Sequence, residues 1–145
     1  MKEKAKITVA VLVDVPLKDA WESFIGEDCV VHWNFASDDW HCPWARNDFR
    51  VGGEFVYRME ARDGSFGFDF GGTYQAIEDR KRIAYVMGDD RRVELSFTQD
   101  GDSTRVVETF EAEGQNSLEL QRQGWQAILD NYKKFAESRK KANCK

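Results

Sequence analysis

One acidic residue, Glu108, lies in a strand-like stretch in which apolar and polar residues alternate. If Val106 and Phe110 face the interior of the protein, Glu108 faces it too. A carboxyl group in an apolar cavity has a raised pKa and can act as a general acid or base. The opposite parity places Val107 inside and Glu108 in water, and the sequence leaves both alternatives open.

The segment 54–77, EFVYRMEARDGSFGFDFGGTYQAI, predicts a β-hairpin. Asp63-Gly64 is a strong signal for a type I′ turn, and such a turn would place Tyr57 opposite Phe70. Clean alternation of this kind predicts one buried face, and large rings on that face need a partner layer. The residues on this face are Phe55, Tyr57, Met59, Phe66, Phe68 and Phe70.

Aromatic and large apolar side chains could together line a ligand pocket, although they could equally form a fully packed core. A buried tyrosine hydroxyl needs a hydrogen-bond partner and can orient a ligand, which draws attention to Tyr57, Tyr74 and Tyr132. The candidate lining residues are Trp33, Trp40, Trp44, Phe55, Tyr57, Met59, Phe68, Phe70, Tyr74, Trp125, Leu129 and Tyr132, together with Glu108.

The segment 34–47, NFASDDWHCPWARN, contains two acids, a histidine and a cysteine, but their spacing is not that of a metal site. His41 and Cys42 are adjacent, and His32 lies nine residues before His41. We therefore expect no metal and no cofactor. His41 is the best candidate for a group that titrates near neutral pH at the mouth of a pocket.

Two arginines, Arg50 and Arg122, could pair with an acidic ligand, although such residues more often form ion pairs on the surface. The sequence has no Gly-rich phosphate loop after a strand and no Gly-x-Ser-x-Gly motif.

The composition is typical of one folded domain. The chain has 145 residues, of which 41% are hydrophobic and 13% aromatic. No apolar run approaches the length of a membrane span, and the charged N-terminus does not resemble a signal peptide. Three cysteines without framework spacing favour a reduced, cytoplasmic setting. The net charge of −5 disfavours nucleic-acid binding.

The order of predicted elements indicates an α+β fold. We expect a curved antiparallel sheet around a long C-terminal helix, with two short helices after the first strand.

Gly71-Gly72 are expected to mark a β-bulge, and Asn116 with Glu119 a helix-capping box. From Lys133 onward, six basic residues minus one acidic residue give a local balance of +5, which suits a helix end and a solvated tail. The predicted elements are strands 5–13, 82–87, 92–98 and 104–112, helices 17–25 and 27–33, the hairpin 54–77, and a helix from about 117 to 140.

Three runs carry a family resemblance that extends over about residues 7–137. They are NDFRVGGEFVYRMEARDGSFGFDFGGTY, VVETFEAE and LQRQGWQAILDNYKKF. They resemble the START-like superfamily called SRPBCC, and within it the bacterial relatives of the heat-shock-protein-90 ATPase activator, often labelled polyketide-cyclase-like. The resemblance implies a helix-grip fold, in which about seven strands curl around the long helix and often leave an apolar cavity. Fold alone does not name a function.

Three functional hypotheses follow. The preferred one is a cytoplasmic protein that binds a small, largely apolar molecule between the sheet and the C-terminal helix. The second is an enzyme of cyclase or dehydratase type that uses Glu108 and a tyrosine. The third is a module that docks on a chaperone or forms a homodimer through an exposed strand edge or an aromatic loop, with Trp40 and Trp44 as the expected anchors. The resemblance speaks against a chaperone role, because activators carry an additional N-terminal domain for which 145 residues leave no room.

Overall fold

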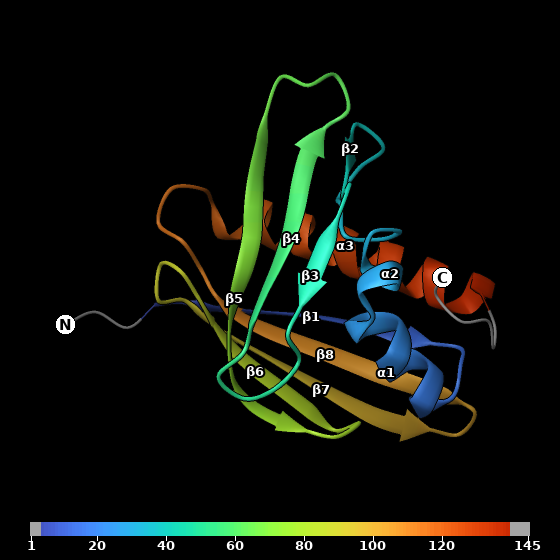
Figure 1. Ribbon diagram of the computed structural model, residues 1–145. Helices are drawn as coiled ribbons and strands as arrows, with labels where there is room; N and C mark the ends of the chain where they lie inside the picture. The colour runs from blue at the N-terminus through green and yellow to red at the C-terminus, as the bar shows by residue number, and fades with distance from the viewer. Residues whose placement is uncertain (1–3, 140–145) are drawn as a thin grey trace.

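The computed structural model describes residues 4–139, which form a curved antiparallel sheet, one long helix and two short helices (Figure 1). The expected α+β helix-grip architecture is therefore confirmed. The predicted helix end at Lys140, Cys144 and the last basic residues lie outside the described part of the chain. The elements are β1 (Lys6–Val13), α1 (Leu17–Ile25), α2 (Glu27–Val30), β2 (Trp40–His41), β3 (Ala45–Asn47), β4 (Glu54–Ala61), β5 (Gly67–Glu78), β6 (Arg82–Met87), β7 (Arg92–Asp100), β8 (Ser103–Glu111) and α3 (Leu118–Arg139).

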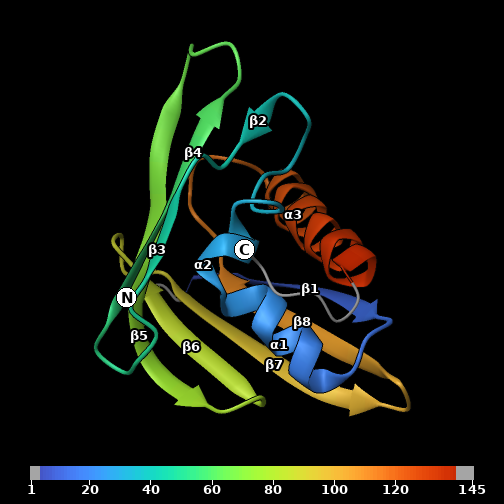
Figure 2. The same ribbon diagram turned by 45° about the vertical axis from the view of Figure 1, so that its right-hand side comes forward.

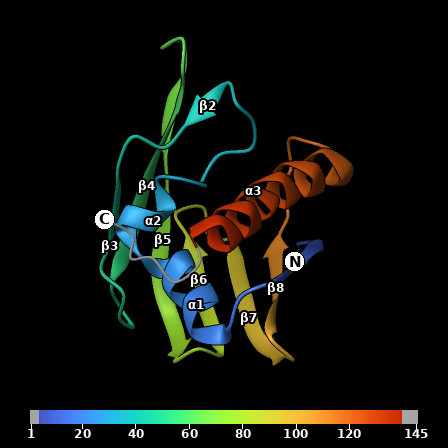
Figure 3. The same ribbon diagram turned by 90° about the vertical axis from the view of Figure 1, so that its right-hand side faces the viewer.

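Eight strands occupy seven positions in the sheet. Their order is β1-β8-β7-β6-β5-β4-β2, and β3 also pairs with β4, so that β2 and β3 share one edge. Figures 2 and 3 show the sheet turning from the upright β4–β5 hairpin to the layer of β6, β7, β8 and β1, with α3 lying across the concave side. The sequence did not predict β2 and β3, because each is too short to show alternation.

The register of the β4–β5 hairpin is as predicted, but its turn is not. Tyr57 pairs with Phe70. A type I′ turn requires a positive φ at both central residues, here Asp63 and Gly64. Among the described non-glycine residues only Arg80 and Asp90 have a positive φ, so Asp63 does not meet this requirement. Instead, the Ala61 N–H donates to Phe66 O at 2.9 Å, which closes a four-residue loop, residues 62–65, centred on the same point. Phe66 is 65% exposed rather than buried, because the tip of the hairpin extends past α3 (Figure 1).

The two glycines of β5 do not form the expected bulge. The bulge lies at Gln75, where the pairing with β6 shifts between Tyr74 and Ala76. A Cβ on Gly71 would lie 2.2 Å from Phe55 O, and a Cβ on Gly72 would lie 2.6 Å from Val86 O. These glycines therefore allow neighbouring backbone to approach closely.

The long helix α3 begins one residue later than expected and covers one edge of the sheet. The Leu120 N–H donates to Ser117 Oγ at 3.0 Å, so Ser117, rather than Asn116, is the N-cap. Arg122 Nη1 donates to Thr8 O at 2.8 Å and Gln126 Nε2 donates to Ala10 O at 3.1 Å. These two bonds occupy carbonyl groups of β1 that point away from β8, and so they protect that edge from pairing with another chain.

The contrast between two glycines gives a stability prediction. Gly71→Ala is expected to lower the free energy of unfolding by about 2 kcal/mol or more, because the new methyl group meets backbone that cannot move aside. In Gly124→Ala, on α3, the added Cβ meets no atom within 4 Å, and the change should stabilise the helix by about 0.5–1 kcal/mol. Urea unfolding of the two variants measures both effects, and a mild effect of Gly71→Ala would contradict the tight packing of β5.

Candidate functional site

A cavity of about 270 Å³ lies between α3 and the concave face of the sheet. Its walls come from α1, the segment after α2, strands β4, β5, β6 and β8, and α3. Aromatic rings make up much of the lining, and a few polar groups lie among them. The lining residues are Phe24, Ile25, Trp33, Asn34, Phe55, Tyr57, Met59, Phe68, Phe70, Tyr74, Ile83, Tyr85, Arg91, Glu108, Glu113, Trp125, Ile128 and Leu129.

Most of the candidates chosen from the sequence meet in this cavity. Phe68 lines the cavity and is also 42% exposed. The sequence candidates that line the cavity are Trp33, Phe55, Tyr57, Met59, Phe68, Phe70, Tyr74, Glu108, Trp125 and Leu129.

Tyr132 does not line the cavity, in contrast to the prediction. It is fully buried, and its hydroxyl donates to Ala20 O at 2.6 Å. Burial raises the pKa of Tyr132 above its usual range. This tyrosine therefore connects α3 to α1, and its hydroxyl proton is donated within the protein rather than to a ligand.

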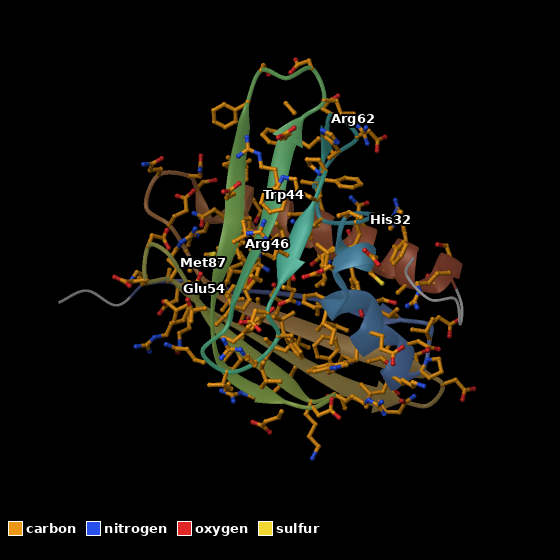
Figure 4. The ribbon with its side chains drawn as sticks, viewed as in Figure 1. His32, Trp44, Arg46, Glu54, Arg62 and Met87 are labelled. Carbon is orange, nitrogen blue, oxygen red and sulfur yellow. The ribbon has the colours of Figure 1, made fainter. Side chains whose placement is uncertain are left out.

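Trp40 and Trp44 also lie outside the cavity. Trp40 is half-buried at the tip of the hairpin, where it makes edge contacts with Phe66 and Phe68 at centroid distances of 6.1 and 5.9 Å. Trp44 is 40% exposed, and the Arg46 guanidinium lies 5.3 Å from the centroid of its ring. Figure 4 shows Trp44 and Arg46 on the face of the hairpin that is turned away from α3.

The other polar candidates of the sequence lie on the surface. His41 Nε2 is 3.8 Å from Glu60 Oε1 and does not line the cavity. Arg50 pairs with Asp48, and Arg122 bonds to Thr8 O. Within residues 4–139, no group of three or more His, Cys, Asp or Glu side chains is placed to hold a metal ion.

The helical wall of the cavity is fixed by ring stacking. Trp125 lies flat against Phe110 of β8, with a centroid distance of 3.9 Å and an interplanar angle of 9°. Trp125 also makes a T-shaped contact with Phe70, with ring centroids 5.9 Å apart. At the other end, Trp33 Nε1 donates to Ser23 O at 3.0 Å, which sets the orientation of the Trp33 ring.

Three tyrosines place hydroxyl groups along the sheet wall on adjacent strands: Tyr57 on β4, Tyr74 on β5 and Tyr85 on β6. The Tyr74 hydroxyl donates to Asn47 Oδ1 at 2.7 Å. Burial raises the pKa of Tyr57 well above its usual value, and the neighbouring Tyr74 and Tyr85 add to this effect. The three phenols are therefore neutral hydrogen-bonding groups at physiological pH.

Glu108 faces inward, which resolves the parity that the sequence left open. It is 7% exposed, and its neighbours Val106 and Phe110 on the same face are fully buried. Burial raises the pKa of Glu108 to about 8, and the Glu108 charge in turn helps to raise the pKa of Tyr85. Near neutral pH the carboxyl group is largely protonated, so it can both donate and accept a hydrogen bond.

Two charged residues at the edge of the cavity are already partnered. Arg91 Nε donates to Asp89 Oδ2 at 2.8 Å. Glu113 accepts the backbone N–H groups of Gln115 and Asn116 at 2.6 and 2.8 Å, and these bonds lower its pKa. Both residues therefore stabilise loops at the rim.

Eight lining residues were missed by the sequence analysis. Tyr85 and Ile83 could have been found from the alternation of β6, and Phe24, Ile25 and Ile128 from helical spacing. Asn34, Arg91 and Glu113 lie in irregular segments, where no periodic pattern signals which way a side chain points.

These features define a helix-grip protein with an internal, mainly aromatic cavity. The family model described as "Activator of Hsp90 ATPase homolog 1-like protein" matches residues 14–137, and the chain belongs to this family. A search of the curated proteins found no match. Among the described residues, no helix is both long and apolar enough to cross a membrane.

Solved structures agree with the assignment. The AHSA1-like protein from Aeromonas hydrophila is 40% identical, with a TM-score of 0.87 over 92% of this chain and 93% of that one. Chr148 from Cytophaga hutchinsonii is 43% identical, with a TM-score of 0.80 over 92% of each chain. NE0264 from Nitrosomonas europaea is 16% identical, with a TM-score of 0.79 over 95% of this chain and 97% of that one, and shows the fold alone.

The raised pKa of Glu108 predicts a pH dependence of stability. Above the ordinary pKa of 4.5 the unfolded chain is ionised, whereas the folded protein keeps the proton up to about pH 8. The unfolded state therefore binds fewer protons in this range, and the free energy of unfolding falls as pH rises. Relative to Glu108→Gln, the wild-type protein should lose stability between about pH 5 and 8, at a rate that approaches about 1.4 kcal/mol per pH unit.

Urea unfolding at several pH values measures this difference. The control is Glu119→Gln, which changes an exposed glutamate on α3 and should leave the pH profile unchanged. Parallel profiles of the wild-type and Glu108→Gln proteins would show that Glu108 is not protonated in the folded state.

Proposed function

We propose that the protein binds a small, largely apolar molecule in the cavity between α3 and the sheet. The observation that carries this proposal is a space of about 270 Å³, lined by aromatic rings, in which Glu108 and tyrosine hydroxyls supply polar contacts. A dry cavity of about 150 Å³ accepts benzene, and drug-sized ligands occupy about 300 Å³ or more. The space therefore suits a ligand of one or two rings. A cytoplasmic location stays a prediction.

Binding can be tested with 6-propionyl-2-(dimethylamino)naphthalene, an uncharged dye of two fused rings whose emission shifts to the blue in apolar surroundings. The wild-type protein should bind the dye saturably. Ile128→Phe should weaken binding about tenfold or more, because Ile128 lines the cavity and the larger ring takes up part of its volume.

The matched control is Leu12→Phe. Leu12 is 41% exposed on β1 and does not line the cavity, so this variant adds the same ring elsewhere and should bind the dye as the wild-type protein does. Absence of saturable binding, or equal binding by Ile128→Phe, would contradict the proposal.

A second candidate function is proton transfer by an enzyme of cyclase or dehydratase type. The buried Glu108 favours it, because a pKa of about 8 lies close to working pH, as efficient general acid–base catalysis requires. Tyr85, whose pKa the Glu108 charge raises further, would hold a substrate oxygen. In such an enzyme, Glu108→Gln would abolish turnover while the dye still binds.

Docking on a chaperone or a second copy has weaker support. The family is named after an activator of a chaperone ATPase, and Phe66 and Trp44 are exposed. However, Trp40 packs against Phe66 and Phe68 within the chain, and α3 covers the edge of β1. We therefore prefer the ligand-binding role.

A further inference from the structure

Glu108 presents its carboxyl group to the cavity without a partner in the described chain. The residue is 7% exposed and forms part of the cavity wall. Within residues 4–139, its carboxyl oxygens make no hydrogen bond and no ion pair. The oxygens are also not completely enclosed by protein atoms, so a molecule in the cavity can reach them. Native proteins rarely keep a buried polar group in this state without a reason.

The sheet fixes the direction of this side chain. Glu108 pairs with Val9 of β1 and with Leu95 of β7, and both partners are buried. Directly paired residues of an antiparallel sheet point to the same face. On β8 itself, Val106 and Phe110 are fully buried on that face. Glu108 is therefore surrounded by apolar neighbours on its own and both adjacent strands, and none of them can form a hydrogen bond with its carboxyl group.

The other charged groups of the cavity wall already have partners. Arg91 Nε donates to Asp89 Oδ2 at 2.8 Å, and Glu113 accepts two backbone N–H groups of its own loop. Arg91 is the one cation among the described lining residues, so no free positive charge is available to Glu108. A ligand carboxylate would likewise find no free cation in the cavity, which makes its entry costly.

The tyrosines of the sheet wall do not supply a partner for Glu108 either. The hydroxyl groups of Tyr57 and Tyr74 interact with each other, and Tyr74 donates to Asn47 Oδ1 at 2.7 Å. The Glu108 charge helps to raise the pKa of Tyr85, yet no hydrogen bond joins these two residues within the described chain. The carboxyl group of Glu108 therefore remains available to a ligand.

The state of this carboxyl group indicates which ligand chemistry fits. Burial raises the pKa of Glu108 to about 8, so near neutral pH the group is largely protonated and offers a donor. A ketone oxygen accepts such a bond as a neutral group, whereas a basic nitrogen can take the proton and form a charge-assisted bond, roughly twice as strong. Aromatic ring faces stabilise the positive charge that results. A weak base also enters the cavity uncharged, and so it avoids the cost of taking an ion out of water.

We propose that Glu108 anchors the ligand by donating its proton to a ring nitrogen, so that the cavity selects mainly apolar nitrogen heterocycles. The proton passes from a Glu108 oxygen to the lone pair of the nitrogen, and none is exchanged with solvent. This inference rests on the proposed ligand-binding function. It differs from the enzymatic candidate, because the ligand leaves the cavity chemically unchanged.

The test compares three bicyclic molecules of similar size: isoquinoline, naphthalene and 1-tetralone. Isoquinoline is a weak base that is uncharged at pH 7, naphthalene has a C–H group in place of its nitrogen, and 1-tetralone offers a ketone oxygen. Each is titrated at pH 7 into isotope-labelled full-length protein and followed by NMR.

The variant Glu108→Met keeps an unbranched side chain and removes the acidic group. It should weaken isoquinoline binding about tenfold or more and 1-tetralone binding less. Naphthalene should bind this variant at least as tightly as the wild-type protein, which shows that the cavity still forms. Glu108→Gln can donate a hydrogen bond but cannot pass on a proton, and its affinity for isoquinoline should be intermediate.

A spectroscopic signature reports the proton itself. The resonance of ¹⁵N-labelled isoquinoline should move upfield on binding to the wild-type protein, because protonation shields a ring nitrogen, and should not do so with Glu108→Met. The matched control is Glu111→Met, which makes the same change on the other face of β8, outside the cavity. This control should bind all three probes as the wild-type protein does.

The outcomes separate this inference from the function on which it rests. If naphthalene binds, equal isoquinoline affinities of the wild-type protein and Glu108→Met, or no upfield shift in the wild-type complex, overturn the role of Glu108 and leave ligand binding intact. A loss of 1-tetralone affinity in Glu108→Met as large as that of isoquinoline overturns the selection for nitrogen. If none of the three binds, the proposed function fails, and the inference fails with it.

Discussion

The flat contact between Trp125 and Phe110 determines how the long helix α3 lies on the sheet. The two rings stack at 3.9 Å, and the Tyr132 hydroxyl fastens the next turns of the helix to Ala20 of α1. Between these anchors, Leu129 is buried against the concave face. The position of α3 determines how much space remains between it and the sheet, so the cavity depends on these contacts of α3.

One helix cannot cover the whole sheet. Seven strand positions at a spacing of about 4.8 Å would span about 29 Å if flat, whereas a helix with its side chains is about 10–12 Å wide. The curvature of the sheet brings its two edges closer together, so that the helix covers more of the concave face. The helices α1 and α2 cover one end of that face (Figure 2). The upper part of the β4–β5 hairpin is left with an incompletely covered face, where the aromatic rings line a space.

Alternation along the strands predicted much of this arrangement. It placed Tyr57 and Met59 on the inner face and offered the inward position of Glu108 as one of two alternatives. The choice depends on the partner strand: Glu108 pairs with Val9, which is buried, and a single strand pattern does not contain that information. The family resemblance supplied the way in which the elements assemble.

The wrong predictions have a common physical cause. Tyr132 has the helical spacing of a lining residue, but its hydroxyl meets a backbone carbonyl that only the tertiary structure brings near. Trp44 precedes the three-residue β3, whose pairing with β4 turns its ring outward. Local pattern thus predicts burial better than it predicts which buried residues face a cavity.

The most direct test of the account is NMR of methyl-labelled protein under xenon pressure, because xenon enters apolar cavities and reports empty space without chemical preference. The account predicts shifts confined to methyl groups that line the cavity: Ile25, Met59, Ile83, Ile128 and Leu129. Buried methyl groups outside it, such as those of Val13 and Leu95, should not respond. Unchanged spectra, or shifts spread evenly over the core, would contradict an open cavity between α3 and the sheet.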